Sequence, residues 1–316
     1  MNTESDSSKE LLRPGKNSAL NYLKKHLFIY LLVLPGLVFL LGFSYGPMYG
    51  ILLAFKDFNY KLGILGSPWA GFKYFEIFFK DPYFWTVVKN TVLINLYNII
   101  FGFTFTVFLA LMLNELRLKR TKQVVQTAVY LPYFLSWVIF AGLVITFLDY
   151  QTGMINGVIK LLGFEPVNFL TDKDKFRAIL VITNTIKTAG YSTIIYLAAI
   201  AGVNPELYES AKIDGANRFH LIKYVTLPRI YPTITILLIL QLSSIFISNF
   251  DQVYNLYSPT VYATGDVIST YIFRIGIEKG QYSVSTAINL LFNFFGLIII
   301  IITNKFTKKL DVMGIF

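Results

Sequence analysis

Apolar runs of about 20 residues recur six times along this chain of 316 residues. A helix of that length can cross a hydrocarbon core roughly 30 Å thick. The composition agrees, because 55% of the residues are hydrophobic and only 15% are charged, which is too apolar for a soluble domain. The first run contains Pro35, Gly36 and Pro47, so we expect it to kink or to end early. We predict an all-α polytopic membrane protein with six transmembrane helices, at residues 27–53, 87–113, 124–148, 178–202, 232–250 and 284–303.

Positive charge predicts the orientation of the chain, because loops on the cytoplasmic side of a membrane carry an excess of Lys and Arg. With both termini inside, the inner loops and tails hold 16 of the 28 Lys and Arg residues, and the longer outer loops hold 11. This places an uncleaved tail (1–26), the loop 203–231 and a second tail (305–316) in the cytoplasm. Anionic lipid at the inner helix ends accounts for the net charge of +10, so we expect membrane lipid and no nucleic acid as a partner.

The chain lacks the residue patterns of catalysis and of metal binding. It contains no cysteine, which excludes disulfides, thiol chemistry and cysteine metal sites. Its two histidines, His26 and His220, are isolated, and no phosphate-binding loop of the G-x-x-x-x-G-K-[ST] kind occurs. We therefore expect that the chain is not an enzyme and holds no metal or cofactor. Any work that it does must draw its energy from another protein or from an ion gradient.

The predicted cytoplasmic loop is polar and charge-balanced between two apolar runs. Its residues 204–206, Asn-Pro-Glu, suit a helix start, since Asn caps the helix, Pro fits the first turn and Glu faces the positive end of the dipole. Gly215 permits a sharp bend. We expect a second short helix over residues 217–224, ended by Pro228, and a fifth span that begins at Pro232.

The same loop carries a recognisable motif, in which Glu209-Ser210-Ala211 is followed by Gly215 and then by Val225-Thr226-Leu227-Pro228. This string resembles the E-A-A-x-x-x-G loop, closed by I-x-L-P, of the membrane permeases of binding-protein-dependent ABC importers. Ser replaces the middle Ala and Val225 replaces Ile, and all spacings fit. Ile213-Asp214 before the glycine and Ala216 after it are similar to the carbohydrate branch, which includes oligosaccharide and polysaccharide permeases related to the maltose permeases. The resemblance covers roughly residues 20–316 and implies the six-helix fold of type I importers, MetI-like and maltose-permease-like.

In that family the loop sits in a cleft of a cytoplasmic ATPase, whose closure switches the permeases between inward-facing and outward-facing states. The resemblance therefore implies two ATPase copies, which would bind the ATP and Mg, and a second, homologous permease in the same bacterial plasma membrane. It also implies an extracellular solute-binding lipoprotein that delivers an oligosaccharide. The residues that would couple this chain to the ATPase are Glu209, Ser210, Ala211, Asp214, Gly215, Ala216, Leu227 and Pro228.

Polar residues inside two predicted spans are candidates for substrate contact, because polar groups are costly in a membrane unless they face a bundle interior or a watery path. In the fourth span they form one predicted stripe, Asn184, Lys187, Thr188 and Tyr191. In the fifth span they are Gln241, Ser244, Ser248 and Asn249. Amides and hydroxyls both donate and accept hydrogen bonds, which suits sugar hydroxyls.

Two interpretations of these stripes stay open. The same residue types also hold membrane helices together without touching a substrate. Lys187 would suit an acidic sugar through a charge-assisted hydrogen bond, but it could equally form an interhelical ion pair or extend toward the membrane surface.

Other functions are weighed against the oligosaccharide importer. The same machinery could carry another solute, such as glycerol phosphate or a modified peptide, and Lys187 keeps this alternative open. An ion-coupled secondary carrier would need buried acidic groups and broken helices, and neither is evident in the sequence. An intramembrane glycosyltransferase would need paired acidic residues within a span, which the sequence also lacks.

Overall fold

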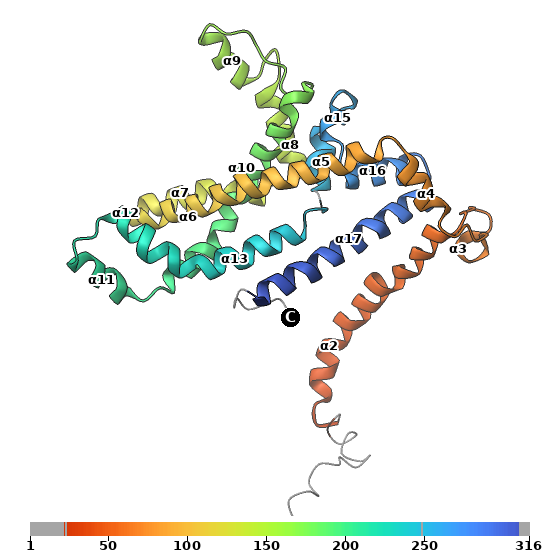
Figure 1. Ribbon diagram of the computed structural model, residues 1–316, viewed down its shortest axis with the longest axis horizontal. Coiled ribbons are helices and arrows are strands. Elements are labelled where there is room, and N and C mark those ends of the chain that lie inside the picture. Colours follow the sequence, from red (N-terminus) through yellow and green to blue (C-terminus); the bar gives the residue numbers. More distant parts are fainter. Residues whose placement is uncertain (1–21, 23, 248, 310–316) are drawn as a thin grey trace, which may run out of the picture. The chain divides into compact units, whose positions relative to one another are not determined.

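A computed structural model describes residue 22 and residues 24–247 and 249–309 (Figure 1). Every regular element within these residues is a helix, which confirms the all-α class. Among the described residues, four helices could each cross a membrane by length and composition, and the number rises to as many as six if each of two bent helix pairs counts as one span. Most of the predicted tail 1–26, and all of the second tail beyond residue 309, lie outside the described residues.

The chain divides into two compact units, residues 1–52 and 53–316. The first predicted span is one helical run, formed by α2 (Leu27–Leu40), η1 (Leu41–Tyr45) and η2 (Gly46–Phe55). Pro35 lies inside α2 without ending it, and the helix tightens to a 3-10 form from Gly46 onward, next to Pro47. The early end that the sequence suggested is therefore wrong, because the run reaches Phe55.

Three spans of the second unit agree in position with the predicted 87–113, 178–202 and 284–303. They are, in chain order, α5 (Phe84–Tyr97) with η3 (Asn98–Phe103) and α6 (Thr104–Glu115), then α10 (Lys173–Ala201), and α17 (Tyr282–Lys309). The helix α10 packs against α6, η3 and α7 (Lys119–Phe134) and is therefore central to the unit.

The third predicted span, 124–148, is broken. Its two halves, α7 and α8 (Trp137–Leu148), meet at an angle of 106°. Pro132 lies in the last turn of α7, and Leu135 has an extended backbone that ends the helix. Ser136 then starts α8 by accepting a hydrogen bond from the backbone N–H of Ile139 at 3.3 Å. This broken helix was not evident in the sequence.

The fifth span begins earlier and ends earlier than the predicted 232–250. One continuous helical run, Arg218–Ser243, consists of α12 (Arg218–His220), η4 (Leu221–Thr226) and α13 (Leu227–Ser243). Pro228 and Pro232 therefore lie inside the run, and the predicted stop at Pro228 is wrong. The π-type turn of η4 directly precedes Pro228, and the Thr226 hydroxyl donates to the Leu221 carbonyl at 3.3 Å. Widened turns and Thr side chains of this kind let a membrane helix accommodate a proline.

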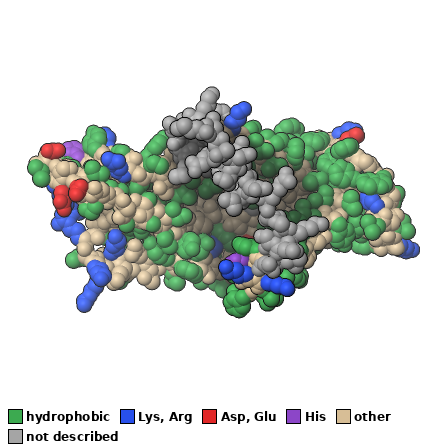
Figure 2. All heavy atoms as spheres, turned by 90° about the horizontal axis from the view of Figure 1, so that it is seen from below, with side chains coloured by type: hydrophobic (Ala, Val, Ile, Leu, Met, Phe, Trp, Pro, Cys, Tyr) green, Lys and Arg blue, Asp and Glu red, His purple; other side chains and the backbone are tan. Residues whose placement is uncertain are grey.

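Short helices connect the spans on the side opposite the loop 203–231. They are α3 (Gly63–Gly66), α4 (Lys73–Lys80), α9 (Met154–Leu161), α14 (Phe250–Leu256), η5 (Pro259–Val261), α15 (Tyr262–Gly265), α16 (Ile268–Phe273) and η6 (Arg274–Glu278). Buried apolar clusters tie them to the spans: Phe78 of α4 packs with Tyr271 and Phe292, and Val253 of α14 packs with Phe176 and Leu180 of α10. Figure 2 shows many apolar side chains along the visible face, with charged ones at both ends, including the end that carries α11 (Pro205–Ile213).

Candidate functional site

The predicted cytoplasmic loop is a two-helix elbow built from α11 and the start of the fifth span. Asn204 caps α11, since its side-chain oxygen accepts a hydrogen bond from the Glu206 backbone N–H at 3.1 Å. The axis of α11 makes an angle of 71° with that of α10, which precedes it by only three residues. The helix start predicted from residues 204–206 is therefore confirmed.

Gly215 makes the turn between α11 and α12. Its φ of +81° lies in the left-handed region that favours glycine. The turn is closed by two backbone hydrogen bonds, from Gly215 N–H to the Lys212 carbonyl at 3.0 Å and from Ala216 N–H to the Ala211 carbonyl at 2.9 Å. Asn217 then caps α12 by accepting from the His220 N–H at 2.9 Å. The bend predicted at the glycine is present.

The inner side of the elbow is anchored to the spans. Tyr208 and Thr226 share a hydrogen bond between their hydroxyl oxygens at 3.0 Å. Leu207, Tyr208 and Leu227 pack against a buried cluster that includes Leu111 and Ile230. The elbow is therefore packed against the second, fourth and fifth spans, which supply the residues of that cluster.

The outer side of the elbow exposes the motif together with large apolar side chains. Ile213 is 87% exposed, Phe219 68% and Tyr224 64%. Of the predicted coupling residues, three are half-buried, namely Ala211, Ala216 and Leu227, and five are exposed, namely Glu209, Ser210, Asp214, Gly215 and Pro228. An exposed surface that combines acidic and large apolar side chains at one end of a membrane protein suits a protein partner.

Five of the predicted substrate residues line two adjoining cavities between the second, fourth and fifth spans. The cavities have volumes of about 170 and 130 Å³ and share Asn98, Asn184 and Gln241. Thr188 lines the first cavity, whereas Ser244 and Asn249 line the second. Ser248 lies outside the described residues. The structure thus brings the polar residues of two separate predicted stripes into one place, which we call the amide cavity.

Three further amides of the amide cavity were missed in the sequence. Asn98 accepts a hydrogen bond from the Asn184 side chain at 3.2 Å, and Asn95 donates to the Ile245 carbonyl at 2.7 Å. Gln252 of α14 donates to the Leu180 carbonyl at 2.6 Å. Asn95 and Asn98 lie three residues apart inside the predicted second span, so the rule that selected the other stripes would also have selected them.

Lys187 and Tyr191 do not face the amide cavity, so the single stripe predicted for the fourth span is wrong. The Tyr191 ring stacks on that of Tyr133 in α7, with centroids 3.9 Å apart. Lys187 is 5% exposed, and its ammonium donates to the carbonyls of Pro132 and Tyr133 at 3.0 and 3.1 Å. The predicted set spans about 100° of the helix circumference. Because α10 packs against η3 and α6 as well as against α7, residues 184 and 188 lie toward the cavity while 187 and 191 lie toward α7.

An apolar cleft of about 390 Å³ adjoins the amide cavity, since Ile247 lines both. Its walls include Phe246, Phe250 and Phe273, with the exposed Asn289 and Asn293 of α17 between them. Asn293 donates to the Asn289 side-chain oxygen at 3.2 Å. Exposed amides in a membrane span face a watery path or another protein rather than lipid.

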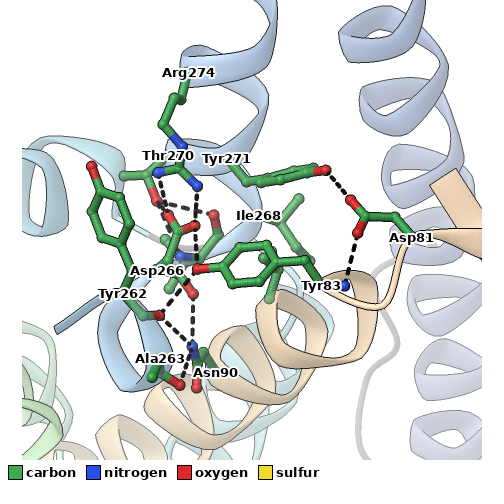
Figure 3. Close-up of polar contacts among 12 residues, drawn as sticks. Asp81, Tyr83, Asn90, Tyr262, Ala263, Asp266, Ile268, Thr270, Tyr271 and Arg274 are labelled. Atoms are coloured by element: carbon green, nitrogen blue, oxygen red, sulfur yellow. Dashed lines mark hydrogen bonds and ion pairs between the residues drawn. The ribbon is translucent and has the colours of Figure 1, made fainter. Parts of the chain in front are cut away.

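A buried ionic network joins the second span to the short helices on the side opposite the elbow (Figure 3). The Asp266 carboxylate is fully buried and forms an ion pair with Arg274. It also accepts hydrogen bonds from the Tyr83 hydroxyl at 3.0 Å and the Thr270 hydroxyl at 2.8 Å. Asn90 of α5 donates to the Asp266 backbone carbonyl at 3.0 Å, so the network joins the second span to α15 and α16.

Burial, and then the neighbouring Asp266 carboxylate, raises the pKa of Tyr83 above its usual range. Burial and the hydrogen bond to Asp81 act in the same way on Tyr271 and raise its pKa. Burial lowers the pKa of Arg274, but the hydrogen bond and charge of Asp266, together with Tyr262 and Tyr257, outweigh burial and raise the pKa. Both phenols are therefore protonated donors and Arg274 is charged at neutral pH. Among the described residues, no group of three His, Asp or Glu could hold a metal ion.

Several apolar spans, an internal polar cavity and an exposed two-helix elbow are the features of a membrane transport subunit. Residues 102–312 match the family described as the binding-protein-dependent transport system inner membrane component. The chain therefore belongs to this family of permeases, a multi-pass membrane protein family with the MetI-like fold.

The relatives of this chain include permeases of sugar importers. It is 40% identical over 307 residues to Protein LplB of Bacillus subtilis (strain 168), an alignment that covers 97% of this chain and 96% of that protein. It is also 40% identical over 289 residues to the polygalacturonan/rhamnogalacturonan transport system permease protein YteP of the same organism, covering 92% and 90%.

Solved structures with this fold include a bacterial ABC transporter involved in the import of the acidic polysaccharide alginate. The match has a TM-score of 0.86 at 40% identity and covers 93% of this chain and 99% of that chain. A second structure, the alginate ABC transporter in complex with an alginate pentasaccharide-bound periplasmic protein, matches with a TM-score of 0.85 at 39% identity and the same coverage.

Proposed function

We propose that the chain is the permease subunit of an ATP-driven importer of oligosaccharides, with both termini in the cytoplasm of a bacterium. The observation that carries this proposal is the elbow, which is anchored inward through Tyr208 and Leu227 and exposes Glu209, Ile213 and Phe219 outward. A rigid, half-apolar projection at the end of α10 is suited to receive force from another protein.

The proposed partners follow from this arrangement. Two copies of a cytoplasmic ATPase bind the ATP and Mg, and one of them grips the elbow of this chain. A second, homologous permease completes the membrane path, and the exposed Asn289 and Asn293 in α17 support such a neighbour or path. An extracellular binding protein delivers the glycan, as the periplasmic protein in the alginate transporter complex suggests.

The amide cavity supports a sugar as the cargo. The two cavities are lined by Asn, Gln, Ser, Thr and Tyr side chains together with apolar ones. Amides and hydroxyls both donate and accept, so they exchange hydrogen bonds with sugar hydroxyls in either direction. The adjoining cleft adds the rings of Phe246, Phe250 and Phe273, which suit the apolar face of a pyranose.

The charge distribution argues against a phosphorylated cargo and against ion coupling. Among the described residues no Lys or Arg lines the amide cavity, so a phosphate group would lack a cation there. No Asp or Glu lines it either, whereas an ion-coupled carrier would need acidic groups for its coupling ion. The third span is broken as in some carriers, but the Lys187 ammonium fills that break and would repel a cation.

In the proposed cycle, ATP-driven closure of the ATPase dimer moves the elbow, and the elbow moves the helices that it is packed on. The fourth and fifth spans belong to that group, and they also form two walls of the amide cavity. The cavity therefore opens toward one side of the membrane or the other as the elbow moves. The permease binds and releases the glycan, and the hydrolysis of ATP belongs to the partner.

The test is reconstitution of the chain with the second permease and the ATPase in liposomes. We expect the sugar-loaded binding protein to raise ATP hydrolysis and to support glycan uptake. Gln241→Leu should lower uptake about tenfold, because it removes hydrogen bonds that the glycan makes. Gln123→Leu, the same change at an exposed position of α7, serves as the matched control. Uptake that needs an ion gradient and no ATPase would refute the proposal.

A further inference from the structure

Lys187 is a buried charge without an acidic partner. Among the described residues, no Asp or Glu forms an ion pair with it. Its ammonium instead donates to three backbone carbonyls of Pro132, Tyr133 and Leu135, at the carboxyl end of α7. The ammonium also lies 5.2 Å from the ring centroid of Trp137 and 5.6 Å from that of Phe140. These carbonyls and rings form a site that fits one cation, and we call it the lysine cage.

The lysine cage lies at the break in the third span. The last carbonyls of a helix have no partner within it, and in a membrane each unpaired one is costly. Lys187 donates to carbonyls at this end of α7, one of which, that of Pro132, also accepts from the Leu135 N–H at 3.3 Å. Its positive charge lies at the negative end of the helix dipole. Ser136 caps the following helix, so a side chain bonds each of the two helix ends at the break. The break is therefore built into the fold.

The helix that supplies Lys187 is held tightly against α7. Gly190 lies one turn further along α10, and a Cβ atom there would lie 1.9 Å from the Val129 carbonyl oxygen. The two backbones thus cross in van der Waals contact, and only glycine fits. With the lysine cage one turn away, α7 and α10 form one rigid pair.

The same helix carries the elbow at its inner end. Three residues separate α10 from α11, so a push on the elbow acts directly on α10. On its other side α10 holds α14, because Gln252 donates to the Leu180 carbonyl and to the Thr183 hydroxyl at 2.9 Å. The outer half of the broken span, α8, packs on α14. The helix α8 is therefore attached to elements that α10 holds in two places, at its start through α7 and along its middle, where Ala141 packs with Val253 of α14.

We propose that Lys187 is a positioning residue of the transport cycle, which locks the broken third span to the helix that carries the elbow, so that α8 moves with α10. The proposal rests on the importer function proposed above. It assigns Lys187 a mechanical role, in which the ammonium binds the carbonyls of α7 and does not contact the glycan. An acidic glycan therefore does not need this lysine, in contrast to the interpretation of Lys187 as a contact for an acidic sugar.

The experiment uses the reconstituted complex with spin labels on the variants Ile145→Cys in α8 and Ile194→Cys in α10. Both positions are exposed, and the chain has no other cysteine. In the otherwise wild-type chain we expect one narrow distance distribution that is the same without nucleotide and with ATP. Lys187→Met should broaden it and make it differ between the two states. Glycan transported per ATP hydrolysed should fall about fivefold, the size of a moderate coupling loss.

Matched variants separate the explanations. Lys187→Arg keeps donors and charge and should restore most of the coupling, and Lys175→Met, at an exposed position of the same helix, should change neither readout. Trp137→Leu removes one ring of the cage but no hydrogen bond, and it should give a smaller loss of coupling in the same direction. This variant keeps the inference testable if the Lys187→Met complex does not assemble. A Lys187→Met or Trp137→Leu complex with wild-type distances and coupling overturns the inference. So does a distance that already changes in the wild type. A wild-type complex without ATP-dependent uptake refutes the importer function instead.

Discussion

Asp266 is the residue at which α15, α16 and the start of the second span meet. Its carboxylate is fully buried, yet it is matched by Arg274, whose guanidinium also lies 4.4 Å from the Tyr262 ring centroid. Two hydroxyls, of Tyr83 and Thr270, occupy further lone pairs of the carboxylate. A buried ion pair of this kind contributes to specificity of position more than to net stability, and it becomes costly when one partner is removed.

We therefore predict that Asp266→Asn destabilises the protein by about 3 kcal/mol, because it leaves the buried Arg274 without its counter-charge. The apparent melting temperature in detergent should fall by several degrees. Asp251→Asn makes the same chemical change at an exposed position and should leave the melting temperature nearly unchanged. Equal effects of the two substitutions would show that the buried ion pair of Asp266 with Arg274 does not stabilise this group of helices.

At this scale the sequence predicts residue types better than directions. Asn184, Thr188 and Gln241 were selected because amides and hydroxyls are costly in a membrane, and the structure places them together. Lys187 and Tyr191 met the same criterion but face α7. Their direction depends on the carbonyls that the break in the third span leaves free, and that break is a tertiary feature.

At the scale of elements, the elbow was predictable because its signals are local. A cap at Asn204 and a glycine at 215 act within a few residues of themselves, and both behave as expected. The proline signals failed, since Pro228 and Pro232 lie inside a helix that continues through them. Proline removes one hydrogen bond, and η4 together with the Thr226 hydroxyl accommodates that loss.

For the elbow we predict that Gly215→Ala clearly lowers glycan uptake, whereas it lowers the stability of the protein only a little. The substituent has open space around it, but a φ of +81° costs a residue with a Cβ about 1 kcal/mol, so the turn between α11 and α12 shifts. Binding of the ATPase, measured by co-purification, should weaken with it. Gly202→Ala, three residues before α11 and at negative φ, is the control and should bind normally. If the Gly215 variant bound the ATPase normally, the proposal that the ATPase binds at the elbow would be contradicted.

At the scale of the whole molecule, the amide cavity and the lysine cage depend on how the spans pack, which a single sequence does not reveal. Asn98, Asn184 and Gln241 come from three spans, and their meeting depends on how α10 packs against η3 and α13. Helix lengths and apolar content predict that spans exist, whereas the rotation of each span about its own axis follows from these contacts. The orientation in the membrane is different again, because it follows from charge and lipid.

That orientation gives the last prediction, and the lack of cysteine makes it clean to measure. Lys223→Cys lies in η4 of the elbow and Gln151→Cys in the loop before α9, and both positions are exposed. Because the Lys and Arg excess places the elbow inside, a membrane-impermeant maleimide should label the Gln151 variant in intact cells and the Lys223 variant only after permeabilisation. The unsubstituted chain, with no thiol, is the control for background. Labelling of Lys223→Cys in intact cells would place the elbow on the outer face, where no ATPase could act on it.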